Sequence, residues 1–309
     1  MKSSTFTFKD QDGIEIFVYK WEPDNSQVKG CIQFSQGLAE HALRYQYVAD
    51  YLTQKGFICY ADDHRGHGKS IKDGNKGYLG PNGWDGTVNS IHELTNIIKK
   101  ENPNQPVFFL GHSWGSFLGQ DVIQQWGSDY KGIILSGTRG GANKIQLKIG
   151  GILARRAAKK SPTAPNKRLD DMNLKPLNKR WAKEPGATTH EWLCSDKEVV
   201  KKYLDDPLCG FTMPSGFFVD MLYGFNKIWK KSNEQKIPKE LPIYFLAGEL
   251  CPVSQETKSI DKLMKRYQSY GITDIEHKYY PNDRHEIYNE VNKEEVYEDV
   301  ANWLEKHLN

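Results

Sequence analysis

Short apolar runs alternate with helical patterns over the first half of the chain. Residues 14–19 alternate apolar and polar side chains with a period of two, which predicts a half-exposed strand. Continuous apolar runs predict buried strands at residues 31–34, 57–60, 107–110 and 133–135. Helical patterns separate these runs at residues 42–54, 88–100 and 114–126. This alternation predicts an α/β fold, with a mostly parallel sheet covered by helices on both faces.

The pattern changes after Gly137. Residues 139–240 are basic, favour helix and contain several prolines, whereas a strand pattern returns at residues 243–246. The remaining expected elements are a helix near 255–269, a strand near 274–280 and a helix at 292–307. We therefore expect two segments of one core, residues 1–138 and 241–309, with a helical insertion at 139–240. An insertion at this edge of a sheet commonly forms a lid over a ligand crevice.

The composition is typical of a folded globular protein. Hydrophobic residues make up 38% of the 309 residues, which excludes a disordered chain. No apolar run approaches the roughly 18 residues of a membrane-spanning helix, and the first residues lack a signal-peptide pattern. We therefore expect a cytoplasmic protein. The five cysteines include no C-x-x-C pair, so the sequence indicates free thiols rather than a disulfide framework or a zinc site.

Charge is distributed unevenly along the chain. The net charge of +3 is too small to indicate a nucleic-acid partner. Residues 139–240 nevertheless carry 21 basic and 11 acidic residues, and the rest of the chain has an acidic excess. Ile149 and Ile152 lie among the basic residues near the start of this segment. Two interpretations stay open: a solvated basic face, or a peripheral contact with anionic lipid headgroups through an amphipathic helix.

Residues 111–115 (Gly-His-Ser-Trp-Gly) fit the pattern G-x-S-x-G. An apolar strand precedes this pentapeptide and a helical pattern follows it, as a nucleophile elbow requires. The glycines leave room for a sharp turn that exposes the serine hydroxyl, and the helix N-terminus favours negative charge beside it. Ser113 is therefore the candidate nucleophile. The alternative is that Ser113 only caps the helix.

A serine hydroxyl needs a base, and the chain order expected with this motif is serine, acid, histidine. The histidines beyond the late apolar strand are His277, His285 and His307. His277 falls within an expected strand and His307 at the end of the last helix, whereas His285 follows the strand in a loop. We therefore expect His285 to be the base rather than a surface histidine.

Taken together, these segments resemble the monoacylglycerol lipase and lysophospholipase branch of the α/β-hydrolases. The matching segments are QGLAEH at 36–41 with Arg44 and Tyr45, DHRGHG at 63–68, GHSWGS at 111–116, DPLCGF at 206–211 and DRHE at 283–286. The resemblance implies an eight-stranded sheet with a helical cap between strands six and seven. It further implies hydrolysis of a carboxylic ester through an acyl-serine intermediate. We expect the substrate to be a monoacyl lipid, either a lysophospholipid or a monoacylglycerol, or a related acyl ester. The backbone N–H groups of Leu38 and Trp114 are the implied oxyanion donors.

Two positions depart from the family pattern. The oxyanion loop reads Gln36-Gly37 instead of His-Gly, which leaves a backbone donor available and lets the glutamine side chain hold the loop. More importantly, Cys251 stands where relatives carry the triad aspartate. Three explanations are open: Glu249 supplies the acid, a Ser–His pair or a more distant acid works at a reduced rate, or the chain is nearly inactive. A neutral thiol does not stabilise an imidazolium as a carboxylate does.

Other activities are compatible with the same fold. A small-ester esterase or an acyltransferase would differ only in pocket shape, and a catalytically impaired binding protein would explain Cys251. The sequence implies no metal or organic cofactor and sets no oligomeric state. Residues 63–68 contain two histidines and an aspartate, as a zinc site would, but the resemblance favours a structural loop near the active site.

Overall fold

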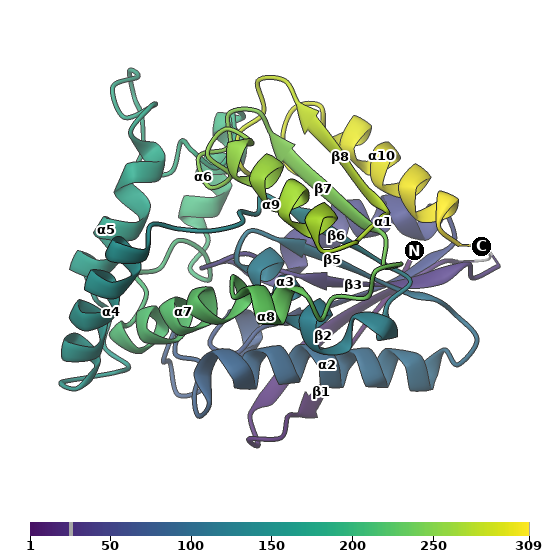
Figure 1. The fold of residues 1–309 in the computed structure, drawn as a ribbon, viewed down its shortest axis with the longest axis horizontal. Coiled ribbons are helices and arrows are strands. Elements are labelled where there is room, and N and C mark those ends of the chain that lie inside the picture. Colours follow the sequence, from purple (N-terminus) through teal and green to yellow (C-terminus); the bar gives the residue numbers. More distant parts are fainter. Residues whose placement is uncertain (25–26, 309) are drawn as a thin grey trace.

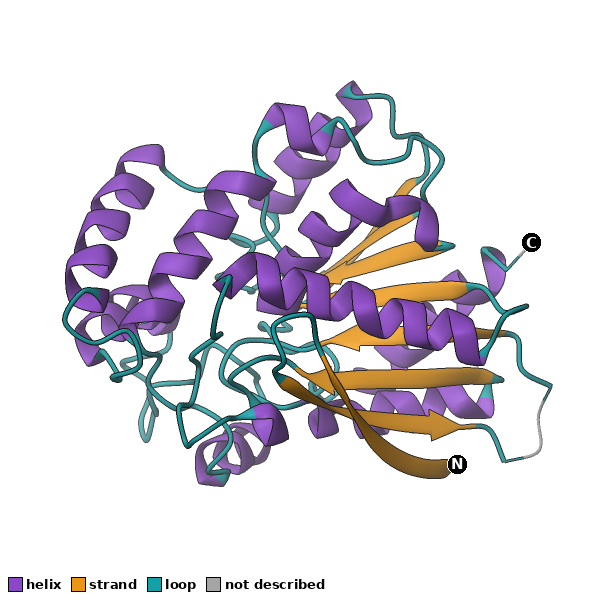
Figure 2. Cartoon of the chain, turned by 90° about the horizontal axis from the view of Figure 1, so that it is seen from below, coloured by secondary structure: helices purple, strands orange, loops and turns teal. Residues whose placement is uncertain are grey.

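The computed structural model describes residues 1–24 and 27–308. In this part of the chain eight strands form one sheet, in the order β1-β2-β4-β3-β5-β6-β7-β8. The strands are β1 (Lys2–Lys9), β2 (Glu15–Glu22), β3 (Gly30–Ser35), β4 (Phe57–Asp63), β5 (Val107–His112), β6 (Gly132–Ser136), β7 (Ile243–Gly248) and β8 (Ile275–Tyr280). β1 and β2 run antiparallel to their neighbours, and the pairs from β4 to β8 are parallel. The parallel strands end next to the loops and the inserted helices (Figure 2).

Helices cover both faces of the sheet (Figure 1). One face carries α1 (Gln46–Gln54) and α10 (Lys293–Lys306), and the other carries α2 (Gly83–Glu101), α3 (Trp114–Trp126) and α9 (Lys258–Ser269). Short 3-10 helices lie at η1 (Ala42–Tyr45), η2 (Gly68–Ser70) and η3 (Gly127–Asp129). No helix among the described residues combines the length and the apolar character needed to cross a membrane.

Two buried clusters, one on each face of the sheet, form the core. Strand β5 shows how the sequence produces both. Phe109 packs into the cluster under α2 and α3, whereas Phe108 and Leu110 pack into the cluster under α1 and α10. Successive side chains of a strand point to opposite faces, so a continuous apolar run is what a strand buried on both faces requires.

Five helices are inserted between β6 and β7. They are α4 (Lys144–Ala158), α5 (Lys167–Asn178), α6 (Lys197–Asp205), α7 (Ser215–Ile228) and α8 (Lys231–Glu234). We call the residues between β6 and β7 the insert. α7 packs against the core so closely that a Cβ atom at Gly224 would overlap the ring of Trp84. α4 and α5 lie farther from the sheet (Figure 1). The predicted α/β fold with helices inserted between strands six and seven is confirmed, and the three-part domain division stays a prediction.

Element boundaries differ from the sequence pattern at a few places. The helix expected from residue 255 begins at Lys258, because Gln255, Glu256 and Thr257 all adopt positive φ angles. The helix expected at 42–54 is divided into η1 and α1. β1 was not predicted from its own pattern, because it is an exposed edge strand and most of its side chains face solvent.

Candidate active site

Ser113 lies in the sharp turn between β5 and α3. Its backbone has φ 51° and ψ −118°, which places it outside both helix and strand conformations. The flanking glycines are required by close backbone approach. A Cβ atom at Gly111 would lie 2.6 Å from the carbonyl oxygen of Gly115, and one at Gly115 would lie 2.5 Å from that of Gln36. The strand–turn–helix arrangement of a nucleophile elbow is therefore present.

His285 lies in the loop that follows β8, and only 1% of it is exposed. Its ring packs between His112 and Trp192, at centroid distances of 4.7 and 5.0 Å. Ser113 and His285 line the same cavity. In the described part of the chain, the buried Nε2 atom of His285 has no hydrogen-bond partner and no bond joins it to Ser113. Catalytic hydrogen bonds are often long without substrate, so this geometry leaves Nε2 available to a hydroxyl.

The other ring nitrogen of His285 faces Cys251. The Sγ atom of Cys251 lies 3.1 Å from Nδ1, where the triad aspartate of the family would stand. Burial lowers the pKa of His285 well below its usual range, and the neighbouring His112 lowers it further. Burial also raises the pKa of the Cys251 thiol. At neutral pH the pair therefore consists of a neutral imidazole and a neutral thiol.

The structure does not bring Glu249 to His285, which corrects the expectation that Glu249 supplies the acid. Glu249 is exposed, and its backbone N–H donates to the carbonyl of Tyr280 (3.0 Å) as a continuation of strand pairing. The chain then turns, with the N–H of Cys251 donating to the carbonyl of Gly248 (3.0 Å). This turn directs residue 251 toward the histidine. Among the described residues, no carboxylate forms a hydrogen bond or ion pair with His285.

Leu38 and Trp114 lie at the nucleophile, as the resemblance implies. Both line the cavity with Ser113, and in the described residues neither backbone N–H has a hydrogen-bond partner. The neighbouring Gly37 N–H donates to Oε1 of Glu40 (2.5 Å), and the Gln36 side-chain amide donates to the carbonyl of Glu40 (3.0 Å). The glutamine that replaces the family's histidine thus holds the loop, as the sequence suggested.

A buried charge network joins this loop to the loop of His285. Arg44 forms ion pairs with both Glu40 and Glu286, donating to the Glu286 oxygens at 2.9 and 2.6 Å. The hydroxyl of Tyr45 donates to Glu40 (2.9 Å). Burial alone would raise the pKa of Glu286, but the guanidinium and hydrogen bonds of Arg44 outweigh it and keep that pKa below its usual range. These residues belong to segments that match the family pattern, but the sequence alone assigned them no role.

The 63–68 segment supports the elbow from the other side. Asp63 accepts hydrogen bonds from the backbone N–H groups of Ala42 (2.7 Å) and Lys69 (2.8 Å). The His67 ring stacks on Trp114 at 5.0 Å, and burial lowers the pKa of His67 to about 3. Arg65 is fully buried and pairs with Asp10. These contacts favour the structural interpretation of this segment.

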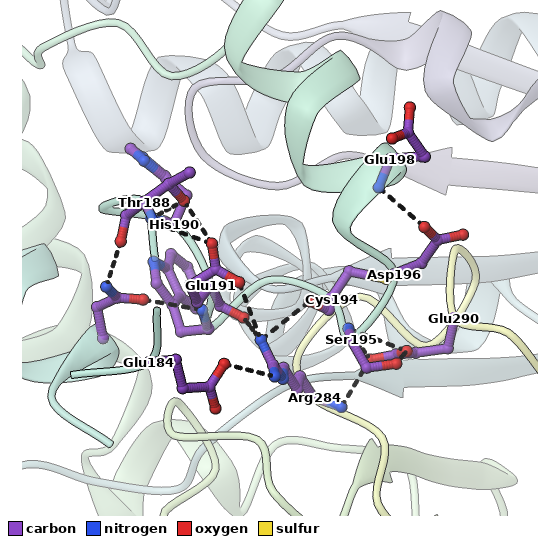
Figure 3. A network of polar contacts seen from close by, with 12 residues as sticks. Glu184, Thr188, His190, Glu191, Cys194, Ser195, Asp196, Glu198, Arg284 and Glu290 are labelled. Atoms are coloured by element: carbon purple, nitrogen blue, oxygen red, sulfur yellow. Dashed lines mark hydrogen bonds and ion pairs between the residues drawn. The ribbon is translucent and has the colours of Figure 1, made fainter. Parts of the chain in front are cut away.

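The insert contacts the loop of His285 directly (Figure 3). Arg284 donates to the carbonyl oxygens of Glu191 (2.5 Å) and Cys194 (3.2 Å). The carboxylate of Glu290 accepts from the backbone N–H groups of Ser195 and Arg284, both at 2.9 Å. One segment of the insert is therefore fixed to the loop that carries the histidine.

A cavity of about 480 Å³ opens over Ser113. Its walls are mainly apolar, and the insert contributes most of them. Side chains of α4, α5 and α7 that line it include Leu147, Leu174, Leu177, Met221, Leu222 and Phe225. Arg139, Asp170 and Asn173 add polar groups. A hydrophobic chain therefore fits this space better than a polar substrate does.

The charge network generates a stability prediction. Replacing Glu286 with Gln should lower the free energy of unfolding by about 3 kcal/mol, because it breaks a buried ion pair. The native pKa of Glu286 is lowered, so its contribution is present above the ordinary carboxyl pKa and is lost as pH falls through the native value. Urea unfolding at several pH values should show the two proteins converging in acid.

The matched control is Glu298→Gln, because Glu298 is an exposed carboxylate on α10. Its effect should stay within about 0.5 kcal/mol at every pH. Equal stability of Glu286→Gln and the unmodified protein at neutral pH would contradict the assigned role of the network.

Comparison with known proteins agrees with this geometry. The family model described as serine aminopeptidase, S33, matches residues 26–292. A monoacylglycerol lipase of Mycolicibacterium smegmatis is 26% identical over 306 residues, covering 99% of this chain and 98% of the relative. A human monoglyceride lipase is 25% identical, covering 91% of this chain and 86% of the relative.

Solved structures show the same fold. A thermostable carboxyl esterase from Bacillus coagulans superposes with a TM-score of 0.91 at 25% identity, with both chains fully covered. The family predicted from the sequence motifs is thereby confirmed. This chain belongs to the serine aminopeptidase S33 family of α/β-hydrolases and is a serine hydrolase similar to the monoacylglycerol lipases.

Proposed function

We propose that this protein hydrolyses the carboxylic ester of a monoacyl lipid, either a monoacylglycerol or a lysophospholipid, through an acyl-serine intermediate. One observation carries the proposal: the elbow serine and an unpartnered histidine nitrogen open into an apolar cavity walled by the insert. The names of the relatives, which include monoacylglycerol and monoglyceride lipases, agree with this substrate class.

The proposed reaction has two halves. Ser113 Oγ attacks the ester carbonyl while Nε2 of His285 takes the hydroxyl proton, and the N–H groups of Leu38 and Trp114 stabilise the oxyanion. His285 then gives the proton to the departing alcohol, which leaves an acyl-serine. In the second half a water molecule, deprotonated by His285, attacks the acyl-serine carbonyl; the bond to Ser113 Oγ breaks, Oγ takes the proton back from His285, and the fatty acid leaves. The acyl chain occupies the apolar cavity throughout.

Cys251 takes the position of the orienting acid in this scheme. A neutral thiol at 3.1 Å can donate to Nδ1 or accept from it, so it fixes neither tautomer of the ring. Only the tautomer with its proton on Nδ1 leaves Nε2 free to act as base. The thiol also supplies no charge to stabilise the imidazolium. We therefore expect hydrolysis at a rate well below that of an enzyme with a carboxylate here.

Ser113→Ala tests the nucleophile. Hydrolysis of a chain-length series of p-nitrophenyl esters should fall to background, because no other hydroxyl occupies the elbow. Ser4→Ala, on the exposed strand β1, is the control and should keep the full rate. Equal low rates in all three proteins would contradict the proposed esterase and favour an impaired binding protein.

Cys251→Asp tests the acid position. Removing the acid of a serine protease triad costs about 10⁴ in turnover, so restoring it here should raise kcat by roughly 10²–10⁴. The pH profile should also move. The neutral histidine is the active base, and a nearby carboxylate raises its pKa, so the acid limb of kcat/KM should shift to higher pH.

Cys251→Asn is the matched control, since it has the shape of aspartate without the charge. It should produce neither the gain in kcat nor the shift in pH profile. A gain in Cys251→Asn as large as in Cys251→Asp would remove the electrostatic argument. A loss in Glu249→Gln as large as in Ser113→Ala would return the acid role to Glu249.

We also propose that α4 contacts an anionic lipid surface. Ile145, Ile149 and Ile152 lie at helical spacing along α4 and are 69, 52 and 39% exposed. Lysines and arginines lie among them, at Lys144, Lys148, Arg155 and Arg156. An apolar stripe flanked by basic residues is typical of helices that lie in the headgroup region. α4 also lines the cavity, so this contact would bring a lipid substrate to its entrance.

Vesicle co-sedimentation tests the membrane contact. The protein should sediment with vesicles of phosphatidylglycerol and phosphatidylcholine, and less with pure phosphatidylcholine. The double variant Ile145→Ser, Ile149→Ser should lose most of this binding because it removes the apolar stripe. Met172→Ser, an exposed apolar residue on α5, is the control. Equal sedimentation of the double variant and the unmodified protein would contradict the proposed contact.

A further inference from the structure

Three potential metal ligands meet beside the candidate active site. His41 follows the loop that carries Leu38, and Asp206 and Cys209 follow α6 in the insert. Their ligand atoms all lie within 4.8 Å of one another. Nε2 of His41 is already 3.0 Å from Oδ2 of Asp206. We propose that His41, Asp206 and Cys209 bind a divalent cation of the zinc class.

The donor set suits such an ion. Thiolate and imidazole are the ligands that zinc prefers, and a carboxylate is a common third. Bonds of 2.0–2.3 Å in a tetrahedron place neighbouring ligand atoms roughly 3.5 Å apart. Because no separation exceeds 4.8 Å, each pair of ligand atoms would have to approach by about 1.3 Å at most. Three protein ligands leave a fourth position for water.

Burial and charge also favour a cation at this position. His41 and Cys209 are buried, with 8 and 6% exposed, whereas one third of the Asp206 side chain is exposed and provides a route for the ion. The charged groups that act on Cys209 are three carboxylates and one guanidinium: Asp206, Glu40, Glu286 and Arg44. The local charge is therefore negative before any metal binds.

Zinc binds a cysteine as the thiolate, so binding at Cys209 releases a proton. Burial raises the pKa of the Cys209 thiol, so the metal must displace a proton from sulfur to solvent. Burial also acts to raise the pKa of Asp206, but hydrogen bonds from the Leu208 N–H (2.8 Å) and His41 outweigh it, so this carboxylate is ionised.

The ion would join the insert to the core. The N–H of Gly210 and the hydroxyl of Tyr203 both donate to the carbonyl of Ala39, each at 2.9 Å. Ala39 follows Leu38, and these hydrogen bonds already bring the two segments together. A metal bound by His41 on one side and Asp206 and Cys209 on the other would add a cross-link at this junction. Bound metal should consequently raise Tm.

A second cluster of potential metal ligands in the same chain would compete for the ion. Asp274, Glu276 and His307 also bring their ligand atoms within 4.8 Å. This set has no thiol, and Nζ of Lys306 lies 3.0 Å from Glu276, which already neutralises part of its charge. It should therefore bind zinc more weakly than the set that contains Cys209.

Calorimetric titration of the metal-stripped full-length protein with Zn²⁺ tests the proposal. We expect one tight site, weakened more than about 10-fold in Cys209→Ser because a direct ligand is lost. Cys194→Ser is the matched control, since Cys194 is also buried but outside the cluster. His307→Gln removes the competing cluster, and both variants should keep the tight site. Unchanged affinity in Cys209→Ser, or its loss in His307→Gln, would overturn the assignment.

Cobalt identifies the ligands spectroscopically, whether or not the serine variant folds. Co²⁺ bound to the unmodified protein should show a thiolate-to-cobalt charge-transfer band in the near ultraviolet. Cys251→Ala should keep this band and Asp206→Asn should weaken cobalt binding. A missing band in the unmodified protein, or one that disappears with Cys251, would refute the proposed site.

Discussion

A guanidinium between two buried carboxylates holds the two loops beside the nucleophile together. Arg44 pairs with Glu40, beside the loop that carries Leu38, and with Glu286, the neighbour of His285. These loops follow β3 and β8, which β5, β6 and β7 separate in the sheet. Arg44 thus connects two loops that start from strands which are not neighbours in the sheet. Burying three charges is costly unless each is hydrogen-bonded, and Gly37, Tyr45 and Asn289 supply the remaining donors.

Much of the fold was predictable because buried side chains recur along the sequence with the repeat of their own element, which is about 3.6 residues in a helix and two in a strand. The apolar pattern alone predicted the strand before Ser113 and the helix after it, which are β5 and α3 in the structure. Both elements are largely buried, so most of their positions are apolar. β1 lacked such a pattern because it lies at an exposed edge, where polar residues are acceptable and hydrogen bonds to β2 define the strand.

The site was predictable only in part. Ser113 and His285 were predicted because a motif and a chain order constrain them, and the structure places both on one cavity. The acid depended on the direction of side chains in the turn after β7. Backbone hydrogen bonds decide that direction, and they turn Cys251 inward and Glu249 outward. The ion pairs of Arg44 could not be predicted from local sequence patterns, because Arg44 and Glu286 are 242 residues apart in the chain.

The backbone hydrogen bonds between the insert and the loop of His285 have a mechanical consequence. The N–H of His285 donates to the carbonyl of Trp192 (3.3 Å), and that of Glu286 donates to the carbonyl of Leu193 (2.7 Å). This part of the insert cannot swing away as a rigid flap without displacing the base. Any movement that widens the cavity is therefore easier in α4 and α5, which lie farther from the sheet (Figure 1), than at residues 192–193. Substitutions in those two helices would reshape the cavity wall without moving His285, whereas substitutions at residues 192–193 would change the wall and the position of His285 together.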